Sequence, residues 1–178
     1  SSTAAMRREG TTNCRDIVPP DGLLLRSSLP RESFHKALAE AFGAWERIAN
    51  VAFVASDDTE RADIVIGAQA APEGWAFADV VFDAGAEGTV KPIRSSAICL
   101  NPEHRWKLGF DGNLASYDLK YTILHEIGHA IGLDHPGAAR RGQLAMPAAA
   151  GRGGAGGAGA VALPHAPGGG TTGPGGCR

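Results

Sequence analysis

The sequence predicts a single α+β domain, because segments with helical periodicity stand on both sides of segments with strand composition. Apolar residues recur every three or four positions after Pro30 and again around His125, as they do in amphipathic helices. Between these segments, Val51–Val54 and Ala62–Ile66 are rich in the β-branched residues that favour strands. The chain has 178 residues, 43% of them hydrophobic, which suffices for one core and is too little for two large ones. We expect the domain to span residues 21–147.

The chain before the first long helix is predicted to form an arm and a short strand. Residues 1–20 are polar and lead into Pro19-Pro20-Asp21-Gly22, which favours a turn, so we expect an irregular N-terminal arm. Leu23-Leu24-Leu25-Arg26 is a short apolar run that predicts a first strand. Pro30 then stands at a position that the first turn of a helix tolerates. The predicted helix has a buried face of apolar residues: Phe34, Leu38, Ala41, Trp45 and Ile48.

The middle of the chain is predicted to form successive strands. Val51–Val54 and Ala62–Ile66 are separated by a polar segment that favours a solvated loop. Trp75–Phe82 is a further strand candidate. Residues 83–95 contain glycine and proline but no histidine, so we expect a loop there without a structural zinc ion.

A second helix is predicted after the turn-forming sequence Asp111-Gly112-Asn113. Either Ser116 or Asp118 supplies a residue type that caps a helix N-terminus. Apolar residues then repeat at four-residue steps and define the buried face of this helix: Leu119, Ile123, Ile127 and Ile131. The opposite face carries His125 and His129.

The segment from His125 to His135 has the residue types and spacing of a catalytic metal site. His125 and His129 are four residues apart, so two ring nitrogens on one helix face can bind one metal ion. Gly132 permits a sharp turn that brings His135 back as a third ligand. Three protein ligands leave one position of a tetrahedral zinc ion open, as catalysis requires. Glu126 stands where a carboxylate can act as general base. The alternative reading is a helix whose histidines only face solvent.

The long form of this motif, with its glycine and third histidine, resembles the zinc helix of the metzincin metalloproteases, closest to the matrixin and serralysin-like bacterial branch. Other segments stand in the order found in that branch. Trp45 lies near the end of a helix, Ala62–Ile66 reads Ala-Asp-Ile-Val-Ile, and Ile98–Asn101 precedes Trp106. The resemblance covers roughly residues 20 to 147.

The resemblance implies a twisted mixed five-stranded sheet packed on two long helices, with the zinc helix at the floor of a cleft. One catalytic zinc ion would be held by His125, His129 and His135, and Glu126 would act on the attacking water. The strand at Trp75–Phe82 would lie along the cleft and pair with a peptide or protein substrate in an extended conformation. The implied activity is zinc-dependent endopeptidase activity, in a secreted or extracytoplasmic protein.

The resemblance also implies a methionine turn beneath the metal, for which Met146 is the candidate, since no other methionine follows His135. Pro147 follows Met146, so the tyrosine that the family places near the metal has no counterpart. Residues 148–178 are rich in Gly, Ala and Pro, which predicts a disordered tail in place of the family's C-terminal helix. A reading-frame error or decay into an inactive protein would explain that difference. The second candidate function is therefore that of a decayed or latent metzincin, which would be a zinc-containing binding module without turnover. A third candidate is another metallohydrolase with the same ligands.

The three cysteines are an odd number, so at most one internal pair can form. Cys14 invites comparison with the inhibitory propeptide cysteine of matrixins, whose thiolate occupies the open zinc position. An ordinary free or disulfide-bonded cysteine is the alternative that we favour. Carboxylates at Asp83, Glu87 and Asp111 offer ligands to Ca²⁺, but they form no complete calcium loop. The remaining histidines have no partner at ligand spacing and are expected to be non-functional: His35, His104 and His165.

Composition and charge narrow the expected partners. A formal net charge of -2 and a pI near 6.3 give no reason to expect nucleic acid or an anionic membrane as a partner. No apolar run approaches the length needed to span a bilayer, and the first residues show no signal peptide. We expect a monomer that acts on peptides.

Overall fold

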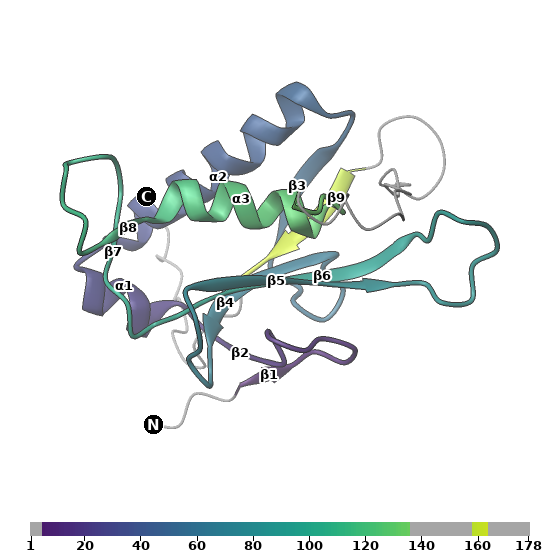
Figure 1. Ribbon diagram of the computed structural model, residues 1–178, viewed down its shortest axis with the longest axis horizontal. Helices are drawn as coiled ribbons and strands as arrows, with labels where there is room; N and C mark the ends of the chain where they lie inside the picture. Colours follow the sequence, from purple (N-terminus) through teal and green to yellow (C-terminus); the bar gives the residue numbers. More distant parts are fainter. Residues whose placement is uncertain (1–4, 136–157, 164–178) are drawn as a thin grey trace, which may run out of the picture.

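The computed structural model describes residues 5–135 and 158–163. Within these residues a mixed sheet carries two helices on one face, and the loop between its first two strands, which contains Cys14, packs on the other face (Figure 1). The fold is therefore α+β, as the sequence predicts. Met146, His165, Cys177 and most of the predicted tail lie outside the described residues.

The sheet runs in the order β1-β2-β4-β6-β5, and β9 pairs with both β3 and β4. Strand β4 is parallel to β6 and β9, whereas β5 is antiparallel to β6 and lies at the edge. In the described part of the chain this mixed sheet has seven strands where we expected five, because the N-terminal segment adds β1 and β2. The strands are β1 (Met6–Arg7), β2 (Asp16–Val18), β3 (Ala52–Ser56), β4 (Ile64–Gln69), β5 (Ala76–Phe82), β6 (Ile93–Leu100) and β9 (Ala158–Ala162).

Three helices are present in the described part of the chain: α1 (Asp21–Ser27), α2 (Arg31–Ile48) and α3 (Leu119–Ala130). Helix α2 begins directly after Pro30, as predicted, and buries Phe34 and Leu38 against the sheet. A second sheet joins β7 (Trp106–Lys107) to β8 (Tyr117–Asp118), immediately before α3.

Helix α1 replaces the strand that we predicted from the leucine run. Leu23 and Leu24 are both buried, whereas Leu25 is 83% exposed, so the run lacks the in–out alternation of a strand. The backbone N–H of Leu24 donates to the carbonyl of Pro20 at 2.9 Å, which forms the first helical turn. Ser28 ends the helix with a left-handed backbone, φ 54°.

Helix α3 is fixed by its cap and by its apolar face. The side chain of Asp118 accepts a hydrogen bond from the N–H of Tyr121 at 2.6 Å, so Asp118 is the capping residue of the two predicted candidates. Leu119, Ile123 and Ile127 are fully buried in the main core. The opposite face of α3 is therefore turned away from the core.

The N-terminal segment is part of the sheet, which differs from the irregular arm that we expected. The carboxylate of Asp79 on β5 accepts the backbone N–H groups of Thr12, Asn13 and Cys14 at 2.8, 2.6 and 2.7 Å. Cys14 forms a disulfide with Cys99 on β6. These bonds hold the segment against the sheet, and the hypothesis that Cys14 supplies an inhibitory thiolate is wrong in this disulfide-bonded state.

Strand β9 differs from the disordered tail that we predicted for the region that contains it. It is parallel to β3 through five residue pairs and parallel to β4 through two. β3 and β4 do not pair with each other, and β9 provides hydrogen-bond partners for backbone groups of both strands. The amino-acid composition of the segment does not reveal this pairing. Ala162 is 1% exposed and belongs to the core.

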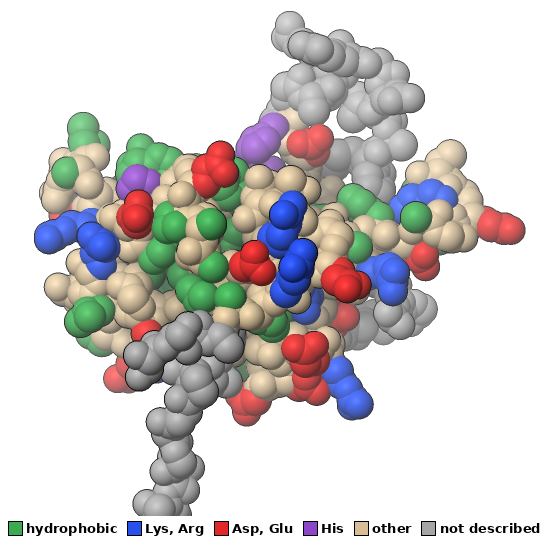
Figure 2. Space-filling view, turned by 90° about the horizontal axis from the view of Figure 1, so that it is seen from below, with side chains coloured by type: hydrophobic (Ala, Val, Ile, Leu, Met, Phe, Trp, Pro, Cys, Tyr) green, Lys and Arg blue, Asp and Glu red, His purple; other side chains and the backbone are tan. Residues whose placement is uncertain are grey.

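The distribution of charge on the surface is relevant to the expectation that neither nucleic acid nor an anionic membrane is a partner. On the face seen in Figure 2, Lys and Arg side chains are interspersed with Asp and Glu side chains. In the described part of the chain, no helix combines the length and the apolar character that a membrane crossing requires.

The disulfide between Cys14 and Cys99 should contribute strongly to stability, because it closes a loop with a sequence separation of 85. In a Cys177→Ser background, we expect Cys14→Ser to lower the free energy of unfolding by about 4–5 kcal/mol. Urea unfolding with and without reductant measures this effect. The Cys177→Ser protein should show no free thiol in denaturant and two after reduction, and two free thiols before reduction would contradict the pairing.

Candidate metal centre

Three histidine side chains converge at the C-terminal end of α3. Their ligand nitrogens lie within 4.8 Å of one another. The Nε2 atom of His125 is 3.0 Å from Nε2 of His129 and 3.3 Å from Nε2 of His135. A tetrahedral zinc ion with Zn–N bonds of about 2.0–2.1 Å separates its ligand nitrogens by about 3.3–3.4 Å. The observed spacing therefore fits three imidazole ligands on one ion.

A tight turn after α3 brings the third histidine to the other two. Gly132 has φ 101°, a left-handed conformation that disfavours any residue with a Cβ atom. Its N–H donates to the carbonyl of His129 at 2.8 Å, and the N–H of Leu133 donates to that of Gly128 at 3.0 Å. These two bonds close the end of the helix and reverse the chain towards His135. The predicted role of Gly132 is thus visible in its backbone.

The hydrogen bonding of His129 favours the tautomer that a metal requires. Its Nδ1 atom lies 2.7 Å from the carbonyl oxygen of Leu133. Because a carbonyl can only accept, Nδ1 carries the proton, and Nε2 is left with a lone pair. That lone pair belongs to the nitrogen that faces His125. A backbone carbonyl behind a ligand histidine is a common arrangement in zinc sites.

Burial sets the charge states in this region. Although His125 is exposed, partial desolvation lowers its pKa, and the neighbouring His129 and His135 lower it further, so the neutral form that binds metal is favoured. Burial also raises the pKa of the Glu126 carboxyl, against a smaller opposing effect of His129. Glu126 is 8% exposed. A carboxylate with a raised pKa beside a metal site is suited to proton transfer near neutral pH.

The centre is supported from behind by Trp45, which was predicted to lie on the buried face of its helix, and by Gly128 and Ser96, which the sequence did not single out. An ideal Cβ atom on Gly128 would lie 2.9 Å from Cζ2 of Trp45, so α2 and α3 approach closely there. The indole N–H of Trp45 donates to the carbonyl of Leu124 at 2.8 Å. The hydroxyl of Ser96 on β6 donates to the carbonyl of Ala130 at 2.7 Å. A glycine inside the second helical segment was the sequence signal available for the close approach at Gly128.

No other cluster of metal-ligating side chains of this size occurs in the described ranges 5–135 and 158–163. Of the carboxylates considered for calcium, Asp111 pairs with Lys107, and hydrogen bonding from that amine lowers the pKa of Asp111. Asp83 accepts the N–H of Gly85 at 3.1 Å. The methionine-turn candidate Met146 is outside the described residues.

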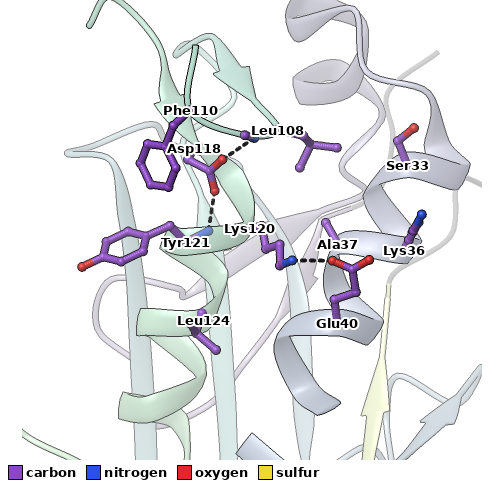
Figure 3. Close-up of a pocket in the computed structure, with 11 residues that line it drawn as sticks. Ser33, Lys36, Ala37, Glu40, Leu108, Phe110, Asp118, Lys120, Tyr121 and Leu124 are labelled. Atoms are coloured by element: carbon purple, nitrogen blue, oxygen red, sulfur yellow. Dashed lines mark hydrogen bonds and ion pairs between the residues drawn. The ribbon is translucent and has the colours of Figure 1, made fainter. Parts of the chain in front are cut away.

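A separate groove of about 550 Å³ lies where α2 meets the beginning of α3 (Figure 3). Its lining is mainly apolar, and Lys120 and Glu40 form an ion pair across it. None of the three converging histidines lines this groove. The groove is therefore distinct from the histidine centre.

Comparison with known proteins supports one family. The family model described as matrixin matches residues 24–147, which include α2, α3 and all three converging histidines. No curated protein and no solved structure matches the chain.

Substitution of Gly128 by alanine should destabilise the protein, although alanine is the better helix former by about 1 kcal/mol. The added Cβ would overlap the Trp45 ring, which predicts a net loss of about 1–3 kcal/mol in urea unfolding. Gly43→Ala is the matched control, because a Cβ on Gly43 of α2 would meet only Arg47, at an ordinary 3.6 Å. In a Trp45→Leu background Gly128→Ala should no longer destabilise, and an unchanged loss there would rule out the overlap.

Glu126→Gln should stabilise the zinc-free protein at pH 7. Since burial raises the pKa of Glu126 in the folded state, the folded state binds more protons than the unfolded state above pH about 4.3. Stability therefore falls as pH rises from there through the folded pKa, and glutamine removes this loss. Melting temperatures in chelator should favour the variant at pH 7 and converge at pH 4. Equal melting temperatures at pH 7 would show that the buried carboxylate carries no penalty.

Proposed function

The chain belongs to the matrixin family, and from this premise we propose that it is a zinc-dependent endopeptidase. The observation that carries the proposal is the convergence of His125, His129 and His135 at distances that fit one zinc ion. A neutral three-histidine donor set leaves a coordination position for a reacting molecule, as in catalytic zinc sites.

We assign the metal to the three imidazoles, through Nε2 of His129 in the tautomer that Leu133 selects. When bound there, zinc supplies a Lewis acid that polarises a carbonyl and lowers the pKa of water to about 7. His125 and His129 are fixed on one helix, while His135 depends on the turn at Gly132. The metal would thus tie the end of α3 to the chain that follows it.

Glu126 is the proposed general base. Its carboxylate would take a proton from the attacking water and later deliver that proton to the leaving amine. A pKa raised by burial makes the carboxylate a better proton acceptor than an exposed glutamate. The same burial excludes bulk water, which would otherwise compete for the proton. Met146 stays a predicted support of the site.

The proposed substrate is a peptide or protein segment in an extended conformation. Strand β5 lies at the edge of the sheet, where its partner in the described residues is β6. An edge strand offers unpaired backbone groups to an added peptide strand. Strand β5 also contacts α3, so a peptide added to this edge would lie along the helix that carries the first two proposed ligands. We further propose a monomer that acts outside the cytoplasm.

The protein should bind one zinc ion, and His129→Ala should reduce the bound metal at least tenfold, measured by metal analysis after dialysis. Zinc-loaded wild type should cleave members of a diverse quenched-fluorescent peptide library. Glu126→Ala should retain zinc and lose about 100-fold or more in kcat/KM, the usual contribution of a general base. Peptidase activity at the wild-type level in Glu126→Ala would refute the mechanism.

The same experiment separates the alternative function. Bound zinc without cleavage of any library peptide would support a decayed or latent matrixin that binds without turnover. Leu114→Ala is a suitable control, because this side chain is 93% exposed in the β7–β8 loop and should affect neither zinc nor cleavage.

A further inference from the structure

Four aromatic rings gather at the end of the molecule where β5 begins. Trp75, the residue before β5, stacks on His104 with ring centroids 3.6 Å apart and planes inclined by 16°. Its centroid is 3.7 Å from that of Tyr117, and it meets Trp106 edge to face at 6.2 Å. We call these four residues the aromatic cluster.

Hydrogen bonds and backbone pairing fix the cluster in place. Trp106 is 2% exposed and donates its indole N–H to the carbonyl of Asn101 at 2.9 Å. Tyr117 is paired with Trp106 in the β7–β8 sheet. The ring of His104 lies 2.9 Å from the carbonyl of Gly74, and the side-chain amide of Asn101 donates to that carbonyl at 2.7 Å. The rings are thus held before any ligand binds.

The cluster is partly open to solvent although it is anchored in the core. Trp75 is 38% exposed and Tyr117 is 46% exposed. Ordered aromatic rings that stay partly exposed lose little side-chain entropy when another ring packs against them. A rigid and partly exposed aromatic surface of this kind is suited to an apolar or aromatic ligand group.

The position of the cluster relates it to the proposed cleft. Tyr117 precedes α3, and His125 follows it by eight residues, which corresponds to about 12 Å along a helix. Figure 1 shows β7, β8 and the N-terminal end of α3 at the same end of the molecule as the start of β5. An extended peptide advances about 3.3 Å per residue, so about 12 Å corresponds to three or four residues.

We propose that the aromatic cluster is a subsite that selects an apolar, preferably aromatic, substrate side chain three or four residues from the scissile bond. Trp75 and Tyr117 supply the contact surface, and His104 and Trp106 position the Trp75 ring. A peptide on the edge of β5 would reach the cluster with its C-terminal flank if it runs antiparallel to β5. This inference rests on the proposed function, because it names a preference of the same cleft.

The test uses zinc-loaded full-length protein and an Ala-based peptide series in which one Phe occupies each position up to four residues on either side of the scissile bond. Wild type should prefer Phe at one distal position by about tenfold in kcat/KM, mainly through KM. Trp75→Ala should abolish this preference, and Trp75→Phe should restore most of it. A shorter peptide that ends before the cluster should be cleaved equally by wild type and Trp75→Ala, which a general loss of folding would not produce.

A binding measurement tests the subsite independently of peptide cleavage. The same peptides, fluorescently labelled, are titrated into zinc-loaded Glu126→Ala and into the Glu126→Ala/Trp75→Ala double variant. Cleavage without any Phe preference that depends on Trp75 would overturn the subsite and leave the peptidase intact. Trp75-dependent binding of the Phe peptides without cleavage by wild type would support the subsite and overturn the peptidase. Leu114→Ala, an exposed apolar residue outside the cluster, should leave the preference unchanged.

Discussion

The packing of one face of α3 on the sheet is the constraint on which the rest of the centre depends. Leu119, Ile123 and Ile127 are fully buried, so the rotation of the helix about its axis is fixed. With that rotation set, His125 and His129 can only lie on the opposite side. Trp45 and Gly128 then set how closely α2 approaches behind them. The convergence of the three histidines is thus a consequence of core packing as much as of their own spacing.

The sequence predicted the parts of this structure that depend on local spacing. The four-residue interval between His125 and His129 follows directly from helix geometry, and the turn needs only a residue that tolerates a positive φ. The cap at Asp118 and the buried face of α3 are local in the same sense. Such features involve residues within one or two helical turns of each other, so they can be predicted from the spacing of residues in the sequence.

Contacts between segments that are distant in the chain could not be predicted from the sequence. The leucine run gave a helix where we predicted a strand, because which leucines are buried depends on tertiary packing rather than on their number. The disulfide between Cys14 and Cys99 joins residues 85 positions apart, and one sequence offers three equal pairings among its cysteines. The aromatic cluster likewise assembles rings from separate segments, without any spacing rule to mark Trp75 or His104 in advance.

The position of β9 has a consequence for the order in which the protein is made. A nascent chain that has reached His135 already contains every proposed metal ligand, together with α2 and α3. Yet the sheet at that stage lacks the strand between β3 and β4, which comes from Ala158–Ala162. Ribosomal synthesis proceeds from the N-terminus, so β9, which lies between β3 and β4, is added to the sheet after the other strands have been synthesised. The framework behind the metal centre therefore closes late, when more than twenty further residues have left the ribosome.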